Sequence, residues 1–228
     1  MIQFYADSLD GQIARLSRED SHHAMRVLRM KPGDEAAIVF DGRRYLATLN
    51  EAGDFLLRSQ LVSTEPQTKI TVYQGISKGE RMEYTVQKCA EIGVHTIVPV
   101  LMKRCVAGLN EKKLERLNRI AKEAGQQAQR THLPTLLEPI DVDTLCERLK
   151  AHEQALILWE EEQRLSLNAA VCGKKDIALV IGPEGGITQE EKEKMAVQAV
   201  TLGKRILRTE TAAPVAAACV LCLQGDMQ

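Results

Sequence analysis

Aromatic residues are scarce in this chain: they make up 4% of its 228 residues, although 44% are hydrophobic. The core must therefore be mainly aliphatic, which is typical of helices packed on a parallel sheet. No apolar run approaches the roughly 20 residues that a membrane-spanning helix needs. Residues 1–7 also lack the basic start and apolar stretch of a secretory signal, so we expect a cytoplasmic protein.

Cysteine spacing gives no sign of a disulfide-rich or zinc-binding protein, and the overall charge indicates no class of partner. The six cysteines (89, 105, 146, 172, 219 and 222) follow no framework spacing, and the Cys219/Cys222 pair lacks the second pair that a zinc site needs. We therefore expect reduced thiols and no metal. The net charge is only −1, yet residues 69–134 hold twelve basic and six acidic residues. This local excess indicates that one face meets a polyanion.

Two regions with different patterns divide the chain. Residues 1–66 contain short strand-like segments, separated by turns at Asp41-Gly42 and Gly53-Asp54, which predict a small β-rich barrel or meander. From residue 69 to 228, strands alternate with helices, which predicts a covered, mainly parallel sheet. The expected strands are 70–76, 95–101, 155–159, 177–181 and 199–202, and the expected helices are 82–92, 111–130, 143–151, 189–196 and 211–223.

The most informative stretch is residues 177–188, Ile-Ala-Leu-Val-Ile-Gly-Pro-Glu-Gly-Gly-Ile-Thr. An apolar strand runs into a glycine-rich turn, and Thr188 with Glu191 forms the sequence of a capping box for the next helix. Ligands bind at such strand ends in open α/β sheets, and glycine lets main chain approach them closely. The loop matches neither phosphate-binding glycine pattern. The alternative interpretation is an ordinary turn.

Two further loops follow strands in the same half of the chain. One begins at Leu158 and Trp159, and the other spans Leu202 to Arg208. Together with the first loop, they present main-chain groups and aliphatic side chains, which suit a neutral heterocycle such as adenine better than a triphosphate. A plain strand-to-helix connection remains the alternative for 202–211.

Basic residues gather on two helices and predict contacts with RNA. One face of the helix 111–130 ends in glutamine and arginine, which can hydrogen-bond phosphates or base edges. A second cluster lies near residue 25, and in both places a solvated charged face is the alternative. The candidate RNA-binding residues are His22, His23, Arg26, Arg29, Lys103, Arg104, Arg119, Gln126 and Arg130.

Four segments together resemble one family: 88–94, 123–130, 181–188 and 202–212. With residues 22–29 and 40–42, the chain resembles, along essentially its whole length, the bacterial 16S rRNA uridine-N3 methyltransferases. These belong to the SPOUT superfamily and carry a PUA-like N-terminal domain. Ile187 and Thr188 stand where the family more often has an aromatic residue and serine, a change that keeps the helix cap.

The resemblance implies a PUA-like RNA-binding domain at 1–66 and a trefoil-knotted methyltransferase domain at 69–228. It implies a homodimer that uses S-adenosylmethionine to methylate one uridine of 16S rRNA in the small ribosomal subunit. The cofactor-binding residues would be Leu158, Trp159, Ile181, Gly182, Pro183, Glu184, Gly185, Gly186, Leu202, Gly203, Ile206 and Leu207.

The catalytic candidates are Arg208, Glu184 and Glu210. Either carboxylate could remove the N3 proton, or Arg208 could stabilise the uracil oxygens without any protein base. Gln126 and Arg130 would lie on the substrate side. Two rival functions stay open: a ribose 2′-O-methyltransferase of the same superfamily, and a non-enzymatic RNA-binding module.

Overall fold

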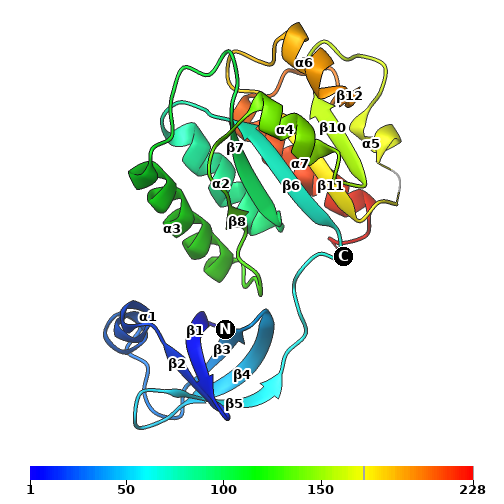
Figure 1. The fold of residues 1–228 in the computed structure, drawn as a ribbon. Helices are drawn as coiled ribbons and strands as arrows, with labels where there is room; N and C mark the ends of the chain where they lie inside the picture. Colours follow the sequence, from blue (N-terminus) through cyan, green and yellow to red (C-terminus); the bar gives the residue numbers. More distant parts are fainter. Residues whose placement is uncertain (172, 228) are drawn as a thin grey trace. The chain divides into compact units, whose positions relative to one another are not determined.

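The computed structural model describes residues 1–171 and 173–227, so that Cys172 lies outside the described residues (Figure 1). The chain divides into two compact units. The first comprises Met1–Glu65 together with Gln126–His132, and the second comprises Pro66–Gly125 and Leu133–Gln228. The expected domains, 1–66 and 69–228, therefore need one correction, because the segment 126–132 belongs to the first unit.

A closed five-stranded barrel forms the first unit's core, with the strand order β1-β2-β5-β4-β3. β1 and β3 are parallel and the other neighbours are antiparallel. The predicted turn at Asp41-Gly42 joins β3 to β4, and both residues have positive φ, as a tight hairpin requires. The strands are β1 (Gln3–Asp10), β2 (Ile13–Leu16), β3 (Glu35–Phe40), β4 (Arg43–Leu49) and β5 (Phe55–Gln60).

A short helical segment connects β2 to β3. Helix α1 (Arg18–His22) begins at Ser17, whose hydroxyl accepts a hydrogen bond from the Asp20 N–H. The chain then widens into a π-helical turn, η1 (His23–Val27), and Arg29 follows with a left-handed φ of 55°.

A parallel sheet forms the centre of the second unit, as the sequence predicts. Its strand order is β12-β10-β11-β6-β7-β8, β9 also pairs with β7, and every pairing in the described part of the chain is parallel. The central strands are buried on both faces, which explains their continuous apolar sequences. The strands are β6 (Lys69–Gly75), β7 (Thr96–Leu101), β8 (Thr135–Leu136), β9 (Ile140–Asp141), β10 (Gln154–Leu158), β11 (Asp176–Ile181) and β12 (Gln198–Val200).

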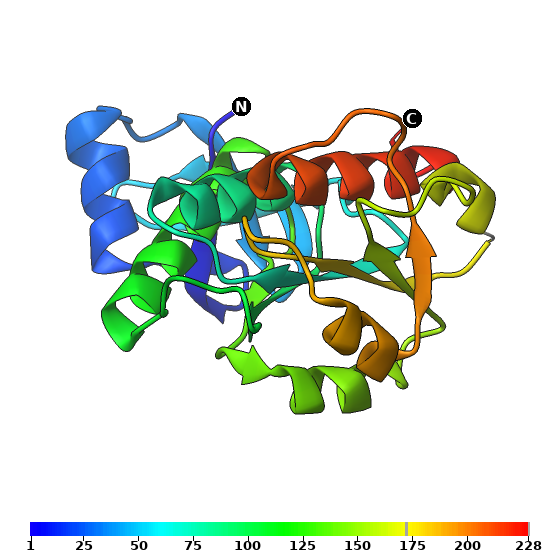
Figure 2. The same ribbon diagram turned by 90° about the horizontal axis from the view of Figure 1, so that it is seen from above.

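Helices cover both faces of this sheet (Figure 2). Apolar side chains of α2, α3, α5 and α7 pack on one face, and those of α4 and α6 pack on the other. None of the described helices has the length and apolar character needed to cross a membrane. The helices are α2 (Glu80–Ile92), α3 (Glu111–Gln127), α4 (Val142–Leu149), α5 (Leu167–Ala170), α6 (Gln189–Met195) and α7 (Thr209–Leu223).

Candidate functional site

The carboxyl ends of the parallel strands lie at one edge of the sheet and bring the three predicted loops together. The loop after β10 is joined to β12 because the Trp159 N–H donates to the Val200 carbonyl at 3.1 Å. The loops after β11 and β12 are joined where the Thr209 hydroxyl donates to the Gly182 carbonyl at 2.5 Å. A fourth segment, residues 76–79 after β6, also contributes, because its Lys78 N–H donates to Glu184 Oε1 at 2.8 Å.

Glycines in the loop after β11 allow close packing of main chain. A Cβ atom on Gly75, at the end of β6, would lie 2.4 Å from the nitrogen of Pro183. A Cβ atom on Gly182 would lie 2.8 Å from Cγ1 of Ile187, and Gly186 has a φ of 74°. The loop therefore needs glycine both for space and for its backbone conformation.

The capping box predicted at the start of α6 is present. Thr188 Oγ1 accepts from the Glu191 N–H at 3.2 Å, and Glu191 Oε2 accepts from the Thr188 N–H at 2.9 Å. The other carboxylate oxygen of Glu191 accepts from the Lys103 N–H at 2.7 Å. Burial raises the pKa of Glu191, but these hydrogen bonds outweigh it and leave the pKa below its ordinary value.

Lys103 and Arg104 follow β7 and are exposed, yet both are engaged with the neighbouring segment 185–191. Lys103 Nζ donates to Glu190 Oε2 at 3.0 Å, and Arg104 Nη1 donates to the Gly185 carbonyl at 2.9 Å. These contacts give both residues a role in fastening the loop after β11. Their contact with RNA stays a prediction.

Gln74 is a buried polar residue of the site that the sequence analysis missed. Its side-chain nitrogen donates to Thr209 Oγ1 at 2.8 Å and to the Gly182 carbonyl at 3.4 Å. Its side-chain oxygen has no hydrogen-bond partner among the residues that the structure describes. The available signal was a single amide near the end of an otherwise apolar strand, Ile-Thr-Val-Tyr-Gln-Gly.

The predicted aliphatic and aromatic loop residues differ in exposure. Trp159 packs in the core beside α4 and α6, with Lys192 Nζ 5.8 Å from its ring centre, so that its main chain alone reaches the loop edge. Ile206 is 85% exposed, and Leu158, Leu202 and Leu207 are half-buried. The last four offer apolar surface to a ligand.

Glu184 is a firmly held carboxylate. Its Oε1 accepts from the Lys78 N–H at 2.8 Å and from Arg81 Nη1 at 2.7 Å. Burial raises the pKa of Glu184, and the hydrogen bonds from Lys78 and Arg81 reverse this and lower it below the ordinary value. Such a carboxylate is a weak base.

Glu210, in the first turn of α7, is held more loosely. Its Oε1 lies 3.7 Å from Arg81 Nε and 4.0 Å from Arg208 Nη1, and its side chain is 14% exposed. Its Oε2 has no hydrogen-bond partner within residues 1–171 and 173–227. The Arg208 side chain is 81% exposed, so its guanidinium is accessible to a substrate.

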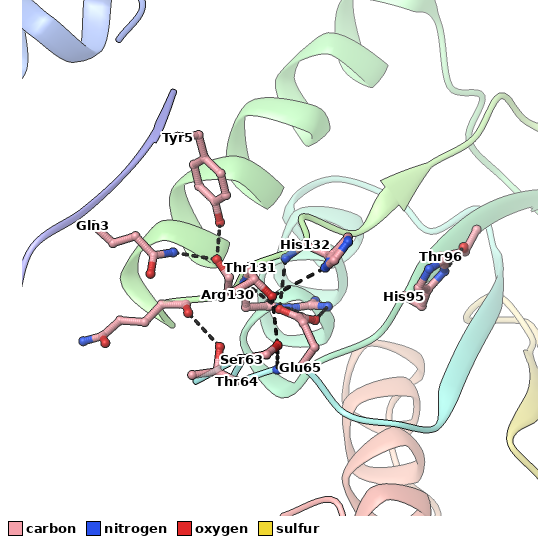
Figure 3. Close-up of polar contacts among 11 residues, drawn as sticks. Gln3, Tyr5, Ser63, Thr64, Glu65, His95, Thr96, Arg130, Thr131 and His132 are labelled. Atoms are coloured by element: carbon pink, nitrogen blue, oxygen red, sulfur yellow. Dashed lines mark hydrogen bonds and ion pairs between the residues drawn. The ribbon is translucent and has the colours of Figure 1, made fainter. Parts of the chain in front are cut away.

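Arg130 does not lie on an accessible substrate face, which corrects the prediction that it ends the basic face of a helix over 111–130. Its side chain is 5% exposed, and its Nη2 lies 2.6 Å from Glu65 Oε2 (Figure 3). The N–H groups of Thr131 and His132 also donate to Glu65, at 2.7 and 3.0 Å. The predicted helical face does not extend to Arg130, because α3 ends at Gln127.

The carbonyl of Arg130 accepts hydrogen bonds from strand β1. Gln3 Nε2 donates to it at 2.5 Å and the Tyr5 hydroxyl donates at 2.9 Å. Burial raises the pKa of Tyr5, which keeps the phenol protonated as a donor. These contacts explain why the segment 126–132 belongs to the first unit.

The remaining RNA candidates keep accessible side chains. His22, His23, Arg26 and Arg29 are exposed on and after the helical segment of the first unit. Arg119 is 67% exposed, with its Nε 3.9 Å from Glu123 Oε1, and Gln126 is half-buried. Their binding to RNA stays a prediction. The described residues contain no group of three or more His, Cys, Asp or Glu that could hold a metal ion.

The fold and the site define a two-domain α/β protein. One domain is a small five-stranded barrel, and the other is a parallel sheet whose carboxyl edge carries loops suited to binding a ligand. The chain belongs to the RNA methyltransferase family. The RNA methyltransferase domain matches residues 64–221, and the RNA methyltransferase PUA domain matches residues 16–56. The resemblance to RNA methyltransferases with a PUA-like N-terminal domain is thus confirmed.

Similar proteins support this assignment along the whole chain. Ribosomal RNA small subunit methyltransferase E of Bacillus subtilis is 31% identical over 217 residues, which cover 86% of this chain and 85% of that protein. The crystal structure of the enzyme with that name from Neisseria gonorrhoeae, bound to S-adenosyl methionine, is 32% identical. It aligns with a TM-score of 0.86 over 98% of both chains. A putative methyltransferase from Legionella pneumophila, in complex with the same cofactor, is 33% identical with a TM-score of 0.83 over 99% of this chain and 97% of that chain.

Proposed function

We propose that this protein transfers a methyl group from S-adenosylmethionine to N3 of one uridine in the 16S rRNA of the small ribosomal subunit. The observation that carries the proposal is the glycine-rich loop after β11, packed on the end of β6 and hydrogen-bonded to the start of α7. The names of the relatives support small-subunit rRNA as the substrate, and their bound cofactor supports the methyl donor. We place this activity in the cytoplasm.

The residues at the sheet edge fit this methyl donor. The loops that begin at Leu158, Ile181 and Leu202 offer main-chain donors and acceptors together with half-buried aliphatic side chains. Gln74 Oε1 is a buried acceptor with no partner in the described structure, and a bound amino group would satisfy it. When bound, S-adenosylmethionine supplies an activated methyl group on its sulfonium. The chain's own task is to align the acceptor base and to manage its proton.

Of the two candidate carboxylates, we take Glu210 as the proton acceptor, because its Oε2 has no hydrogen-bond partner among the described residues. Glu184 is held by two short hydrogen bonds, one of them from the Arg81 guanidinium, whereas the charged partners of Glu210 lie at 3.7 and 4.0 Å. In our proposal Glu210 takes the N3 proton, and the exposed guanidinium of Arg208 stabilises charge on the uracil oxygens. The target base must be unpaired or turned out of its stack to reach these groups.

Replacing Glu210 by glutamine is therefore expected to lower single-turnover methyl transfer about 100-fold. The affinity for S-adenosylmethionine should be unchanged, because the loops that hold it are intact. Rapid-quench transfer of labelled methyl to small ribosomal subunits measures the first quantity, and calorimetry measures the second. Glu147→Gln, at an exposed position on α4, is the matched control. Wild-type turnover in Glu210→Gln would exclude this carboxylate as the base.

The homodimer that the family resemblance implies has a suitable surface on α7. This helix is apolar on nearly all sides, a pattern that normally accompanies complete burial. Yet Val215 and Leu223 are 36% and 47% exposed, and Cys219 and Cys222 are exposed beside them. We propose that a second copy of the chain covers this face.

Replacing Val215 by arginine should consequently convert the dimer to a monomer. The reason is that a charged side chain would have to be buried without a partner in the interface. Light scattering during size-exclusion chromatography gives the mass directly. Glu147→Arg, which places the same side chain on the exposed face of α4, should remain dimeric. A Val215→Arg protein with an unchanged dimeric mass would move the interface elsewhere.

Mass spectrometry of rRNA nucleosides tests the proposed reaction. Small-subunit rRNA from a strain that lacks the protein should have lost 3-methyluridine, and expression of the protein should restore it. Loss of a 2′-O-methylated nucleoside instead would favour the ribose methyltransferase. An unchanged nucleoside profile, together with no binding of S-adenosylmethionine at millimolar concentration, would favour the non-enzymatic RNA-binding module.

A further inference from the structure

Arg81 connects two loops of the candidate site, although no motif in the sequence singled it out. It lies in the first turn of α2, after the segment that follows β6. Its Nη1 is 2.7 Å from Glu184 Oε1, in the loop after β11. Its Nε is 3.7 Å from Glu210 Oε1, which follows the loop after β12. One planar guanidinium thus faces two carboxylates from separate loops.

The loop that carries Glu184 is held at Gly182 by the Thr209 hydroxyl and at Gly185 by Arg104, which leaves Glu184, between them, to be restrained from the side of α2. Its neighbours Gly182, Gly185 and Gly186 have no side chains that could pack, and Glu184 itself is exposed. The Glu184 carboxylate is held by the Lys78 N–H at 2.8 Å, from the segment that leads into α2, and by Arg81 in the first turn of that helix. Because Arg81 hydrogen-bonds Glu184 while its Nε lies 3.7 Å from Glu210, it restricts where this loop lies relative to the start of α7.

Arg81 contributes little to global stability by this contact. Its side chain is 43% exposed and that of Glu184 is 25% exposed, and ion pairs in such positions are weak in water. The contact therefore has its main effect on local geometry. A small displacement of a positioned group costs catalysis far more than it costs folding.

We propose that Arg81 is a positioning residue, which holds the methyl-donor loop at Glu184 and the proton acceptor Glu210 in one fixed arrangement. The inference rests on the proposed function. Arg81 acts through these two carboxylates, so its removal should loosen donor binding and misalign the carboxylate together. Binding of RNA should not change.

The experiment compares wild type, Arg81→Met, Arg81→Lys and Lys88→Met in methyl transfer to small ribosomal subunits. Lys88→Met is the matched control. It also replaces a basic residue of α2 by methionine and removes a 2.7 Å ion pair, here with Glu91, but this pair lies outside the candidate site. We expect Arg81→Met to lower kcat about tenfold and to raise KM for S-adenosylmethionine about tenfold, with KM for RNA and Tm unchanged. Arg81→Lys should recover part of the loss, and Lys88→Met should match wild type.

A double-mutant cycle then tests whether Arg81 acts through Glu210. In the Glu210→Gln background, Arg81→Met should reduce kcat by clearly less than tenfold, because coupled residues are not additive. Full additivity, or an Arg81→Met protein with wild-type kcat and KM, overturns the positioning role. A matching fall in Tm and activity overturns it as well, since the role would then be structural. If the wild type itself transfers no methyl group, the proposed function fails.

Discussion

Replacing Gly186 by valine is expected to abolish detectable binding of S-adenosylmethionine while the protein remains folded. Gly186 has a left-handed φ of 74°, which a β-branched residue adopts only at a cost of about 1–2 kcal/mol. Its added Cβ would lie 2.6 Å from Glu160 Oε1 and 3.6 Å from Arg104 Nη1. The Glu160 side chain can turn away, but valine disfavours the left-handed backbone at the centre of the loop, and calorimetric titration should show affinity reduced by about 100-fold or more.

The matched control is Gly33→Val in the first unit. Gly33 also has positive φ, 97°, but a Cβ there would meet no atom within 4 Å, so that backbone strain is separated from displacement of the loop. This variant should bind the donor like wild type. Gly185 is a less decisive probe, because it lacks a left-handed φ, although an added Cβ there would lie 3.0 Å from Arg104 Cβ. Wild-type affinity in Gly186→Val would show that the loop does not hold the donor.

Replacing Glu65 by glutamine is expected to destabilise the first unit by about 3–5 kcal/mol, because Arg130 would keep its buried charge without a counterion. The side chains of Arg130 and Glu65 are 5% and 15% exposed, so solvent screens this pair poorly. The substitution also weakens the hydrogen bonds from Thr131 and His132. Hydrogen exchange of residues 1–65, followed by mass spectrometry, reports on this unit separately from the sheet.

The same pair gives a defined dependence of stability on pH. Burial raises the pKa of Glu65, but hydrogen bonds and charge from Arg130 outweigh it and lower the pKa below its ordinary value of 4.5. The stabilisation is therefore complete above that value and is lost as the pH falls through the lowered pKa. The difference between wild type and Glu65→Gln should shrink on acidification. Glu35→Gln, at an exposed position on β3, should show neither effect, and equal stability of Glu65→Gln at neutral pH would contradict the account.

Local sequence signals predicted the elements of both units well. The capping box at Thr188 and Glu191, and the hairpin at Asp41-Gly42, are formed by residues within three positions of each other. Strand β1 was not predicted, although Asp10-Gly11 is a hairpin signal between it and β2; its other pairing, with β3, joins residues about 34 positions apart. The segment 126–132 was misassigned for the same reason: Arg130 and Glu65 are 65 positions apart.

The candidate site was also predictable where it depends on local sequence and not where it depends on contacts between distant residues. That the loops after Leu158, Ile181 and Val200 share one edge follows from parallel strands, and the sheet confirms it. The side chains that join those loops, Gln74 and Arg81, could not be found from spacing. Each contacts residues more than 100 positions away, which only the folded sheet brings near.

A crystal structure of this protein grown with S-adenosylmethionine tests the central claim most directly. The account predicts electron density for the donor at the carboxyl edge of the sheet, against the main chain of residues 181–186 and the loops that begin at Leu158 and Leu202. Density for the donor on the barrel or at the opposite edge of the sheet, or none at saturating donor, would contradict it.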